Sequence, residues 1–124
     1  MLITIDFNSD EAIYMQLRNQ IIVAIAMERI REGDALPSVR QLADNIGINM
    51  HTVNKAYSVL RQEGIVKLDR RHGAVVAPDA DKIQAIREMH CEMKMVIAKA
   101  ICKNISVDEI HQAVEEIFSE YKNQ

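Results

Sequence analysis

The stretch PSVRQLADNIGINMHTVNKAYSVLRQE, residues 37–63, decides the fold because it has the pattern of two short helices joined by a tight turn. Ser38 and Gln41 form a capping box, in which the Ser38 hydroxyl accepts from the Gln41 N–H and the Gln41 side chain reaches back to residue 38. Gly47 supplies the positive φ that ends a helix without a Cβ clash, and Asn49 can cap the second helix. These signals predict a helix-turn-helix.

Both predicted helices have one apolar face. The apolar positions recur at helical spacing and are Val39, Leu42, Ala43 and Ile46 in the first helix and Val53, Ala56, Tyr57 and Leu60 in the second. The opposite face of the second helix is polar and carries His51, Thr52, Asn54, Lys55 and Ser58. A hydrogen-bonding surface of this kind fits the major groove of DNA.

The period of the pattern changes after Gly64. Apolar residues at 65, 66 and 68 precede the charged cluster DRRHG at 69–73, and the apolar run 74–76 follows it. This arrangement predicts a β-hairpin with a basic tip, closed by Gly73. A helix-turn-helix followed by such a hairpin is a winged helix-turn-helix, whose tip can contact the phosphate backbone or enter a minor groove. The alternative is an ordinary polar tip of an exposed hairpin.

The segment before the helix-turn-helix predicts a further helix. LITIDF at 2–7 alternates apolar and polar residues, which is typical of an edge strand or an extended arm. Ser9 can cap a helix that runs to about Arg31, with Tyr14 on its flank. Its expected buried residues are Ile13, Leu17, Ile21, Ala24 and Ile25. EGDALP at 32–37 is a turn signal that leads into the helix-turn-helix.

The chain after Pro78 predicts two more helices. The first runs from Asp79 or Asp81 to about Lys103, and its apolar residues recur near a 3.5-residue period with His90 in the same seam. The second begins at Ser106 with a capping box to Glu109. This helical hairpin has more apolar surface than two helices can bury against each other. We therefore expect two domains, 1–78 and 79–124, the latter a helical dimerisation segment that pairs with a second copy.

Composition excludes several classes of protein. The chain of 124 residues is 48% hydrophobic and 27% charged, which is typical of a globular protein, and its longest apolar run, 21–27, is too short for a membrane span of about 20 residues. We expect a cytoplasmic protein. The net charge is −3, but residues 37–76 hold six basic and three acidic side chains, so local basicity remains where DNA would bind.

Neither a metal site nor an enzyme is indicated. His90, Cys91, Cys102 and His111 do not have the spacing of metal ligands, so we expect a seam histidine and two small, buried, reduced cysteines, with no metal and no cofactor. The two cysteines are eleven residues apart, a rise of about 16 Å along one helix, and cannot bridge each other. No nucleotide-binding or hydrolase motif occurs, which favours a protein that is not an enzyme.

Four runs resemble the GntR family of bacterial transcription regulators: LPSVRQLA at 36–43, INMHTVNKAY at 48–57, LRQEGIV at 60–66 and RRHG at 70–73. The resemblance covers roughly residues 10–77, and the short two-helix tail is similar to that of the YtrA subfamily. It implies that the arginine of the LPSxR motif, here Arg40, contacts DNA together with the start of the second helix and the wing tip. From the residues alone, Arg40 could instead pair with Asp44 at i+4.

Two departures from the family pattern stand out. Met50 and His51 occupy positions where relatives often carry Arg or a Pro-Asn pair, and residues 71–75, RHGAV, replace the usual G-x-G-T-F of the wing. By contrast, Asn49, Thr52 and Lys55 match the family's cap, threonine and basic positions. The place of the DNA-reading surface therefore follows from the resemblance, whereas the operator sequence does not.

Taken together, the sequence predicts a mainly α protein: a winged helix-turn-helix followed by a two-helix dimerisation segment. We expect a sequence-specific regulator, a repressor, that binds a palindromic double-stranded operator as a homodimer. The alternative is a winged-helix adaptor that binds proteins without reading DNA. The C-terminal helices are too small to enclose a ligand within one chain, so any effector would lie between subunits.

Two sets of residues carry these expectations. The expected DNA-binding residues are Ser38, Arg40, Asn49, Met50, His51, Thr52, Asn54, Lys55, Arg70, Arg71, His72 and Gly73. The expected dimer-interface residues are Ile83, Ile86, His90, Met93, Ile97, Val114, Ile117, Phe118 and Tyr121.

Overall fold

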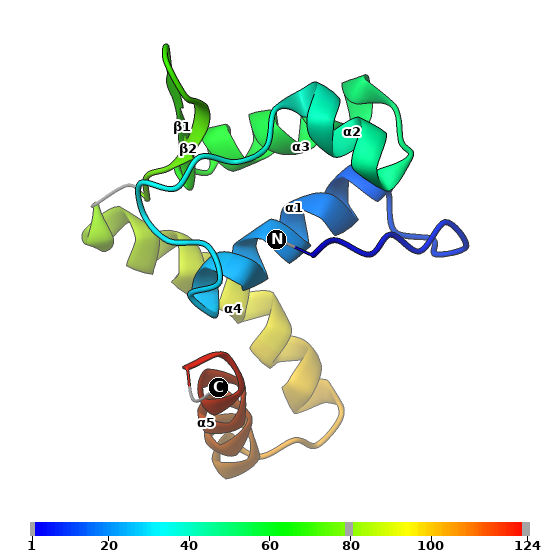
Figure 1. The fold of residues 1–124 in the computed structure, drawn as a ribbon. Coiled ribbons are helices and arrows are strands. Elements are labelled where there is room, and N and C mark those ends of the chain that lie inside the picture. Colours follow the sequence, from blue (N-terminus) through cyan, green and yellow to red (C-terminus); the bar gives the residue numbers. More distant parts are fainter. Residues whose placement is uncertain (1, 79–80, 123–124) are drawn as a thin grey trace. The chain divides into compact units, whose positions relative to one another are not determined.

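The computed structural model describes residues 2–78 and 81–122, which form five helices and two strands (Figure 1). In chain order they are α1 (Ile13–Ala26), α2 (Val39–Ile46), α3 (Met50–Gln62), β1 (Val66–Asp69), β2 (Gly73–Val76), α4 (Lys82–Cys102) and α5 (Val107–Lys122). The chain divides into two compact units, Met1–Pro78 and Asp79–Gln124, which are described separately below.

The helix-turn-helix forms as the sequence predicts. The Ser38 hydroxyl accepts from the Gln41 N–H at 3.1 Å, and the Gln41 side chain accepts from the Ser38 N–H at 3.2 Å, which completes the capping box of α2. Gly47 ends α2 at φ +80°, and Asn49 caps α3 by accepting from the His51 N–H. These local hydrogen bonds satisfy helix-end groups that would otherwise lack partners.

Helices α1 and α2 and strand β1 all pack on α3 (Figure 1). The predicted apolar faces meet there, and the most deeply buried side chains are Leu17, Ile21, Val53, Leu60 and Val76. Because α3 lies at the centre of this core, its polar face is held in a fixed orientation relative to α2 and the hairpin.

Helix α1 is shorter at both ends than the sequence predicts. The Ser9 hydroxyl accepts from the Glu11 N–H in a local turn instead of capping a helix, and α1 begins at Ile13. At the other end Glu28 adopts φ +60°, and the Ile30 N–H bonds back to the Ala24 carbonyl. The predicted end near Arg31 is therefore wrong, because the chain reverses to bury Ile30 in the core.

The N-terminal residues form an extended arm, not an edge strand. Two glutamines on successive turns of α1 hold it: Gln20 accepts from the Thr4 N–H at 2.9 Å, and Gln16 accepts from the Asp6 N–H at 2.9 Å and donates to the Asp6 carbonyl at 3.0 Å. Gln16 is a polar residue buried at 7% exposure. Its amide satisfies arm groups that would otherwise need a strand as partner.

The predicted hairpin is present as the antiparallel pair β1 and β2, with Val66 opposite Val76 and Asp69 opposite Gly73. Gly73 has φ +72°, as expected for the residue that closes the turn. The linker before α2 adds a third segment, because the Leu36 N–H donates to the Ala74 carbonyl at 2.8 Å and the Val76 N–H donates to the Asp34 carbonyl at 2.9 Å. The linker thereby ties the hairpin to the start of α2.

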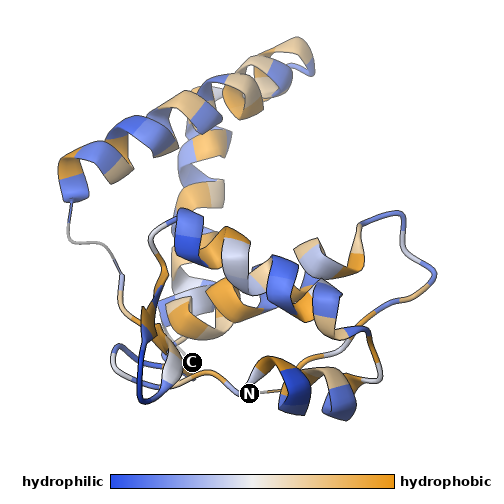
Figure 2. Cartoon of the chain, turned by 90° about the horizontal axis from the view of Figure 1, so that it is seen from above, coloured by the Kyte–Doolittle hydropathy of each residue, from blue (hydrophilic) through white to orange (hydrophobic). Residues whose placement is uncertain are grey.

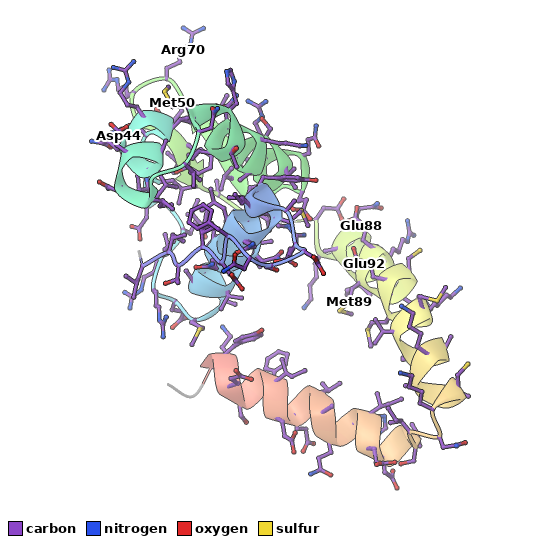
Figure 3. The ribbon with its side chains drawn as sticks, turned by 90° about the vertical axis from the view of Figure 1, so that its right-hand side faces the viewer. Asp44, Met50, Arg70, Glu88, Met89 and Glu92 are labelled. Atoms are coloured by element: carbon purple, nitrogen blue, oxygen red, sulfur yellow. The ribbon has the colours of Figure 1, made fainter. Side chains whose placement is uncertain are left out.

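The second unit contains both predicted helices. Asp81 caps α4, and Ser106 with Glu109 forms the capping box of α5. Neither helix buries a residue in the described part of the chain, and the two diverge from the turn between them (Figure 3). The predicted surplus of apolar surface on these two helices is therefore exposed in this single chain. Cys91 and Cys102 are exposed and unpaired, not buried as expected.

Candidate nucleic-acid interface

The exposed face of α3 presents the polar side chains that the sequence singles out. Asn49, His51, Asn54 and Lys55 are exposed, and Thr52 is half-buried. Met50 is 44% exposed at the first position of the helix. In Figure 3, Met50 and Arg70 both lie at the top of the N-terminal unit. The start of α3 therefore offers hydrogen-bonding groups and one exposed apolar side chain to solvent.

A groove of about 650 Å³ runs between α3 and the hairpin. It brings together four predicted site residues from three elements, namely Ser38, Asn54, His72 and Gly73. A second concavity, of about 600 Å³, lies between the starts of α2 and α3 and is lined by Val39, Asn49, Met50, His51 and Asn54. Asn54 lines both concavities and thus occupies the centre of the polar face.

Most residues that line the groove are absent from the predicted site, among them Ser58, Arg61 and Leu68. Ser58 and Arg61 follow Asn54 at i+4 and i+7 on α3, and Leu68 of β1 is 66% exposed. The predicted polar face already includes Ser58, and helical spacing from Asn54 extends that face to Arg61, because residues at these intervals share a helix face. Leu68 carries no such signal, since its orientation depends on where the hairpin lies against α3.

Arg40 lies in the first turn of α2 with its side chain exposed. Within the described residues it forms no ion pair with Asp44, although helical spacing allows one. The alternative prediction, an Arg40–Asp44 ion pair, is therefore wrong for this structure. Its guanidinium is available to an external anion or base.

The tip of the hairpin is organised by Asp69. Its Oδ1 accepts from the Arg71 N–H at 2.7 Å and from the His72 N–H at 3.3 Å, and it lies 3.4 Å from His72 Nδ1. The hydrogen bond from the Arg71 backbone is the main cause that lowers the pKa of Asp69 below its usual value. Arg70 projects outward from the tip (Figure 3). The tip thus holds two exposed arginines on a turn of defined shape.

The side chain of Lys55 lies against helix α1. Its Nζ lies 4.1 Å from the centroid of the Tyr14 ring on α1, and it lines neither of the two concavities. Arg18, one turn after Tyr14, forms an ion pair with Glu63 at the end of α3. Side chains of α1 therefore contact α3 along the flank that carries Lys55.

The predicted dimer residues all lie on α4 and α5, where apolar residues recur along both helices (Figure 2). Ile83, Ile86, Val114, Ile117 and Phe118 are between 45% and 68% exposed, His90 is exposed, and Met93, Ile97 and Tyr121 are half-buried. This exposed apolar surface is large for a unit of two helices, and such surfaces usually mark an interaction site.

Neither a metal site nor a membrane-spanning helix is found among the described residues. No three His, Cys, Asp or Glu side chains lie close enough together to hold a metal ion. None of the described helices has both the length and the apolarity that crossing a bilayer requires.

Comparison with known proteins gives consistent matches. The family described as "Bacterial regulatory proteins, gntR family" matches residues 10–76. The chain is 32% identical to the HTH-type transcriptional repressor YtrA of Bacillus subtilis, over 98% of this chain and 95% of that protein.

Solved structures match over both units. One is YtrA from Sulfolobus acidocaldarius, described as a GntR-family transcription factor, with 39% identity, a TM-score of 0.64 and coverage of 95% of this chain and 97% of that one. Another is a transcriptional antiterminator from Listeria monocytogenes EGD-e, with 27% identity, a TM-score of 0.80 and coverage of 94% and 90%.

Proposed function

The chain belongs to the GntR family of bacterial regulatory proteins, in its YtrA subfamily, and from this membership we propose that it represses transcription by binding a palindromic operator as a homodimer. It is a transcriptional regulator whose helix-turn-helix is the DNA-binding element. We place its action in the cytoplasm, because its DNA target lies there.

One observation carries the proposed mode of DNA binding. The exposed polar face of α3 is flanked on one side by the capped start of α2 and on the other by the hairpin with Arg70 and Arg71 at its tip. A helix held in this way can enter a major groove while the flanking elements contact the adjacent backbone. In this arrangement α3 reads base edges, Arg40 contacts the operator beside it, and the wing contacts phosphates or a minor groove.

The surface of α4 and α5 supports the homodimer. These helices expose large apolar side chains such as Ile83, Val96, Ile101 and Phe118, which in water carry a free-energy cost until they are covered. A second copy covers the same patch on both chains through a two-fold axis, which is the commonest symmetry of soluble oligomers. The same two-fold axis would present two α3 helices to two half-sites, so the operator should be palindromic.

Repression is proposed from the B. subtilis relative, whose name describes it as a repressor and which this chain matches along nearly its whole length. A dimer bound across a promoter lowers transcription by excluding polymerase. This step needs no effector pocket or catalytic group.

A footprint on the DNA upstream of the protein's own gene tests the proposal. We expect two protected half-sites with related inverted sequences, their centres about 34–36 Å apart or a multiple of that distance. A scrambled duplex of equal length should give no footprint at the same protein concentration. In vitro transcription from the same DNA should fall as the protected fraction rises. Protection of neither half-site, together with retention by a protein partner alone, would favour the adaptor function instead.

A further inference from the structure

Lys55 is the only residue of α3 whose charged group rests on an aromatic ring within the described part of the chain. Its Nζ lies 4.1 Å from the Tyr14 centroid, close enough for a cation–π interaction. Lys55 is exposed and Tyr14 is half-buried, so the ring supports the ammonium from one side and leaves the other side open to solvent. The side chain is thereby directed to the α1 flank of the helix.

The surroundings of Lys55 leave its charge available to an external anion. Its neighbours at i−4, i−3, i+3 and i+4 on α3 are His51, Thr52, Ser58 and Val59, none of which is acidic. Among the described residues no carboxylate pairs with Lys55, and none hydrogen-bonds to the Tyr14 hydroxyl. The Lys55 ammonium and the Tyr14 hydroxyl are therefore two neighbouring hydrogen-bond donors, and neither has an acceptor among the described residues.

The ring itself is held on a fixed support. Gln16, two residues after Tyr14, donates to the Asp6 carbonyl at 3.0 Å and to the Glu11 carbonyl at 2.9 Å, while its oxygen accepts from the Asp6 N–H. These bonds tie the first turn of α1 to the arm that precedes it. Tyr14 itself packs against the buried core of this unit, so its ring is held in place independently of what Lys55 does.

The position of Lys55 argues against base reading. Asn54, its neighbour, lines both concavities of the α3 face, whereas Lys55 lines neither. A lysine that reads a base edge must extend toward the floor of the groove that the helix enters. Lys55 instead rests at the edge of the helix, where the DNA backbone passes when a recognition helix lies in a major groove.

We propose that Tyr14 and Lys55 together form a phosphate-binding site at the junction of α1 and α3. The ring holds the ammonium toward a backbone phosphate, and the phenolic hydroxyl donates a second hydrogen bond to the same phosphate group. Tyr14 acts both as a ligand-contacting residue and as the positioning residue for Lys55. This inference rests on the proposed entry of α3 into a major groove, and it assigns Lys55 a contact that does not depend on DNA sequence.

Fluorescence anisotropy over a salt series tests this assignment, using the upstream DNA of the protein's own gene and a mixed-sequence duplex of about three helical turns. Lys55→Gln should weaken binding to both duplexes by the same factor and lower the slope of log K against log salt by about 0.9. Lys94→Gln on α4 removes one exposed lysine from the other unit and serves as the matched control, with no change expected.

A double-mutant cycle isolates the contribution that the Tyr14 ring makes to DNA binding through Lys55. Tyr14→Leu removes both the ring and the hydroxyl, so it should weaken binding to both duplexes by more than the roughly two- to fivefold that corresponds to an exposed cation–π interaction of about 0.5–1 kcal/mol. In the Lys55→Gln background that loss should shrink to the part that the hydroxyl contributes. Tyr14→Phe keeps the ring and its packing, so it should show the hydroxyl part alone, and it tests the site even if Tyr14→Leu does not fold.

Three results would overturn the inference or its premise. If Lys55→Gln changes the ratio of affinities for the two duplexes, Lys55 reads a base. If both Tyr14 variants bind with wild-type affinity and wild-type salt slope, Tyr14 has no part in binding. If the wild-type protein binds neither duplex at low salt, the proposed function fails, and this outcome is distinct from the other two.

Discussion

At the scale of single residues, Arg40 is the side chain on which DNA binding should depend most. It is exposed in the first turn of α2 and has no ion pair with Asp44 in the described chain. We expect Arg40→Ala to weaken operator binding by about 1–3 kcal/mol, because it removes a guanidinium that can donate to bases and phosphates. Anisotropy with the footprinted DNA measures the loss.

The matched control for Arg40 is Arg87→Ala, which removes an exposed arginine from α4. It should leave operator affinity unchanged. Equal affinities for the wild type and Arg40→Ala would show that the family's arginine contact is not used by this chain.

Tyr57 links the core of α3 to the loop before α2. Its hydroxyl donates to the Pro37 carbonyl at 2.8 Å, and burial raises its pKa. Tyr57→Phe should lower the free energy of unfolding by about 1 kcal/mol, because the Pro37 carbonyl loses its partner. Urea unfolding measures this loss. Ser119→Ala, which removes an exposed hydroxyl from α5, should have little effect.

The raised pKa of Tyr57 also gives a pH dependence. The folded protein holds the phenolic proton more tightly than the unfolded chain does, so this contribution to stability is complete below about pH 10 and is lost as the pH rises further. The free energy of unfolding of the Tyr57→Phe protein should therefore fall less than that of the wild type as the pH rises above about 10. A wild-type and a variant curve of equal shape above about pH 10 would contradict the raised pKa of the buried Tyr57 hydroxyl.

At the scale of elements, the shape of the wing tip depends on one ionised carboxylate. The Asp69 pKa is lowered chiefly by the hydrogen bond from the Arg71 N–H and also by His72. A lowered pKa means that the turn is stabilised above the ordinary pKa of aspartate and loses this stabilisation as the pH falls through the lower value.

An NMR titration tests this link between Asp69 and the wing. The amide signals of Arg71 and His72 should shift together as the pH falls below about 4, the ordinary range of an aspartate. In Asp69→Asn the amide oxygen can still accept from the same N–H groups, but the shift with pH should disappear. Unchanged titration of both signals in the variant would assign the effect to another group.

At the scale of the whole molecule, we expect the apolar stripe of α5 to hold two copies together. Phe118 is 64% exposed, and Phe118→Glu should convert the dimer to monomers because a charge cannot be buried there without a partner. Light scattering after size exclusion should show the mass halved, and operator affinity should fall because each chain then binds one half-site alone.

Ser119→Glu is the matched control for the dimer experiment. Ser119 is exposed on α5, and helical spacing puts it opposite the line through Ile110, Val114 and Ile117. The same charge at this position should leave the mass of the dimer unchanged. A monomeric wild-type protein, or a dimer that survives Phe118→Glu, would contradict the proposed interface.

The helix-turn-helix and the wing were predictable because their signals are local. Ser38 with Gln41, Gly47, Asn49 and Gly73 each act within a few residues, and each adopts the expected cap or turn geometry. The end of α1 was not predictable in this way, since the positive φ falls on Glu28 and not on a glycine. The reversal there depends on the burial of Ile30, which requires the rest of the core.

The sequence by itself determined where the helix-turn-helix and the wing lie and which apolar faces build the core, because helix caps, turns and periodicity are properties of short segments. It also determined the family, because the family's motifs are short runs of the same kind. The tertiary structure alone decided which polar residues come together: the linker at 34–36 joins the hairpin, Asn54 faces both concavities, and Lys55 meets Tyr14. These contacts join residues about 40 positions apart. Such pairs depend on how the elements pack on α3, and no local pattern encodes that packing.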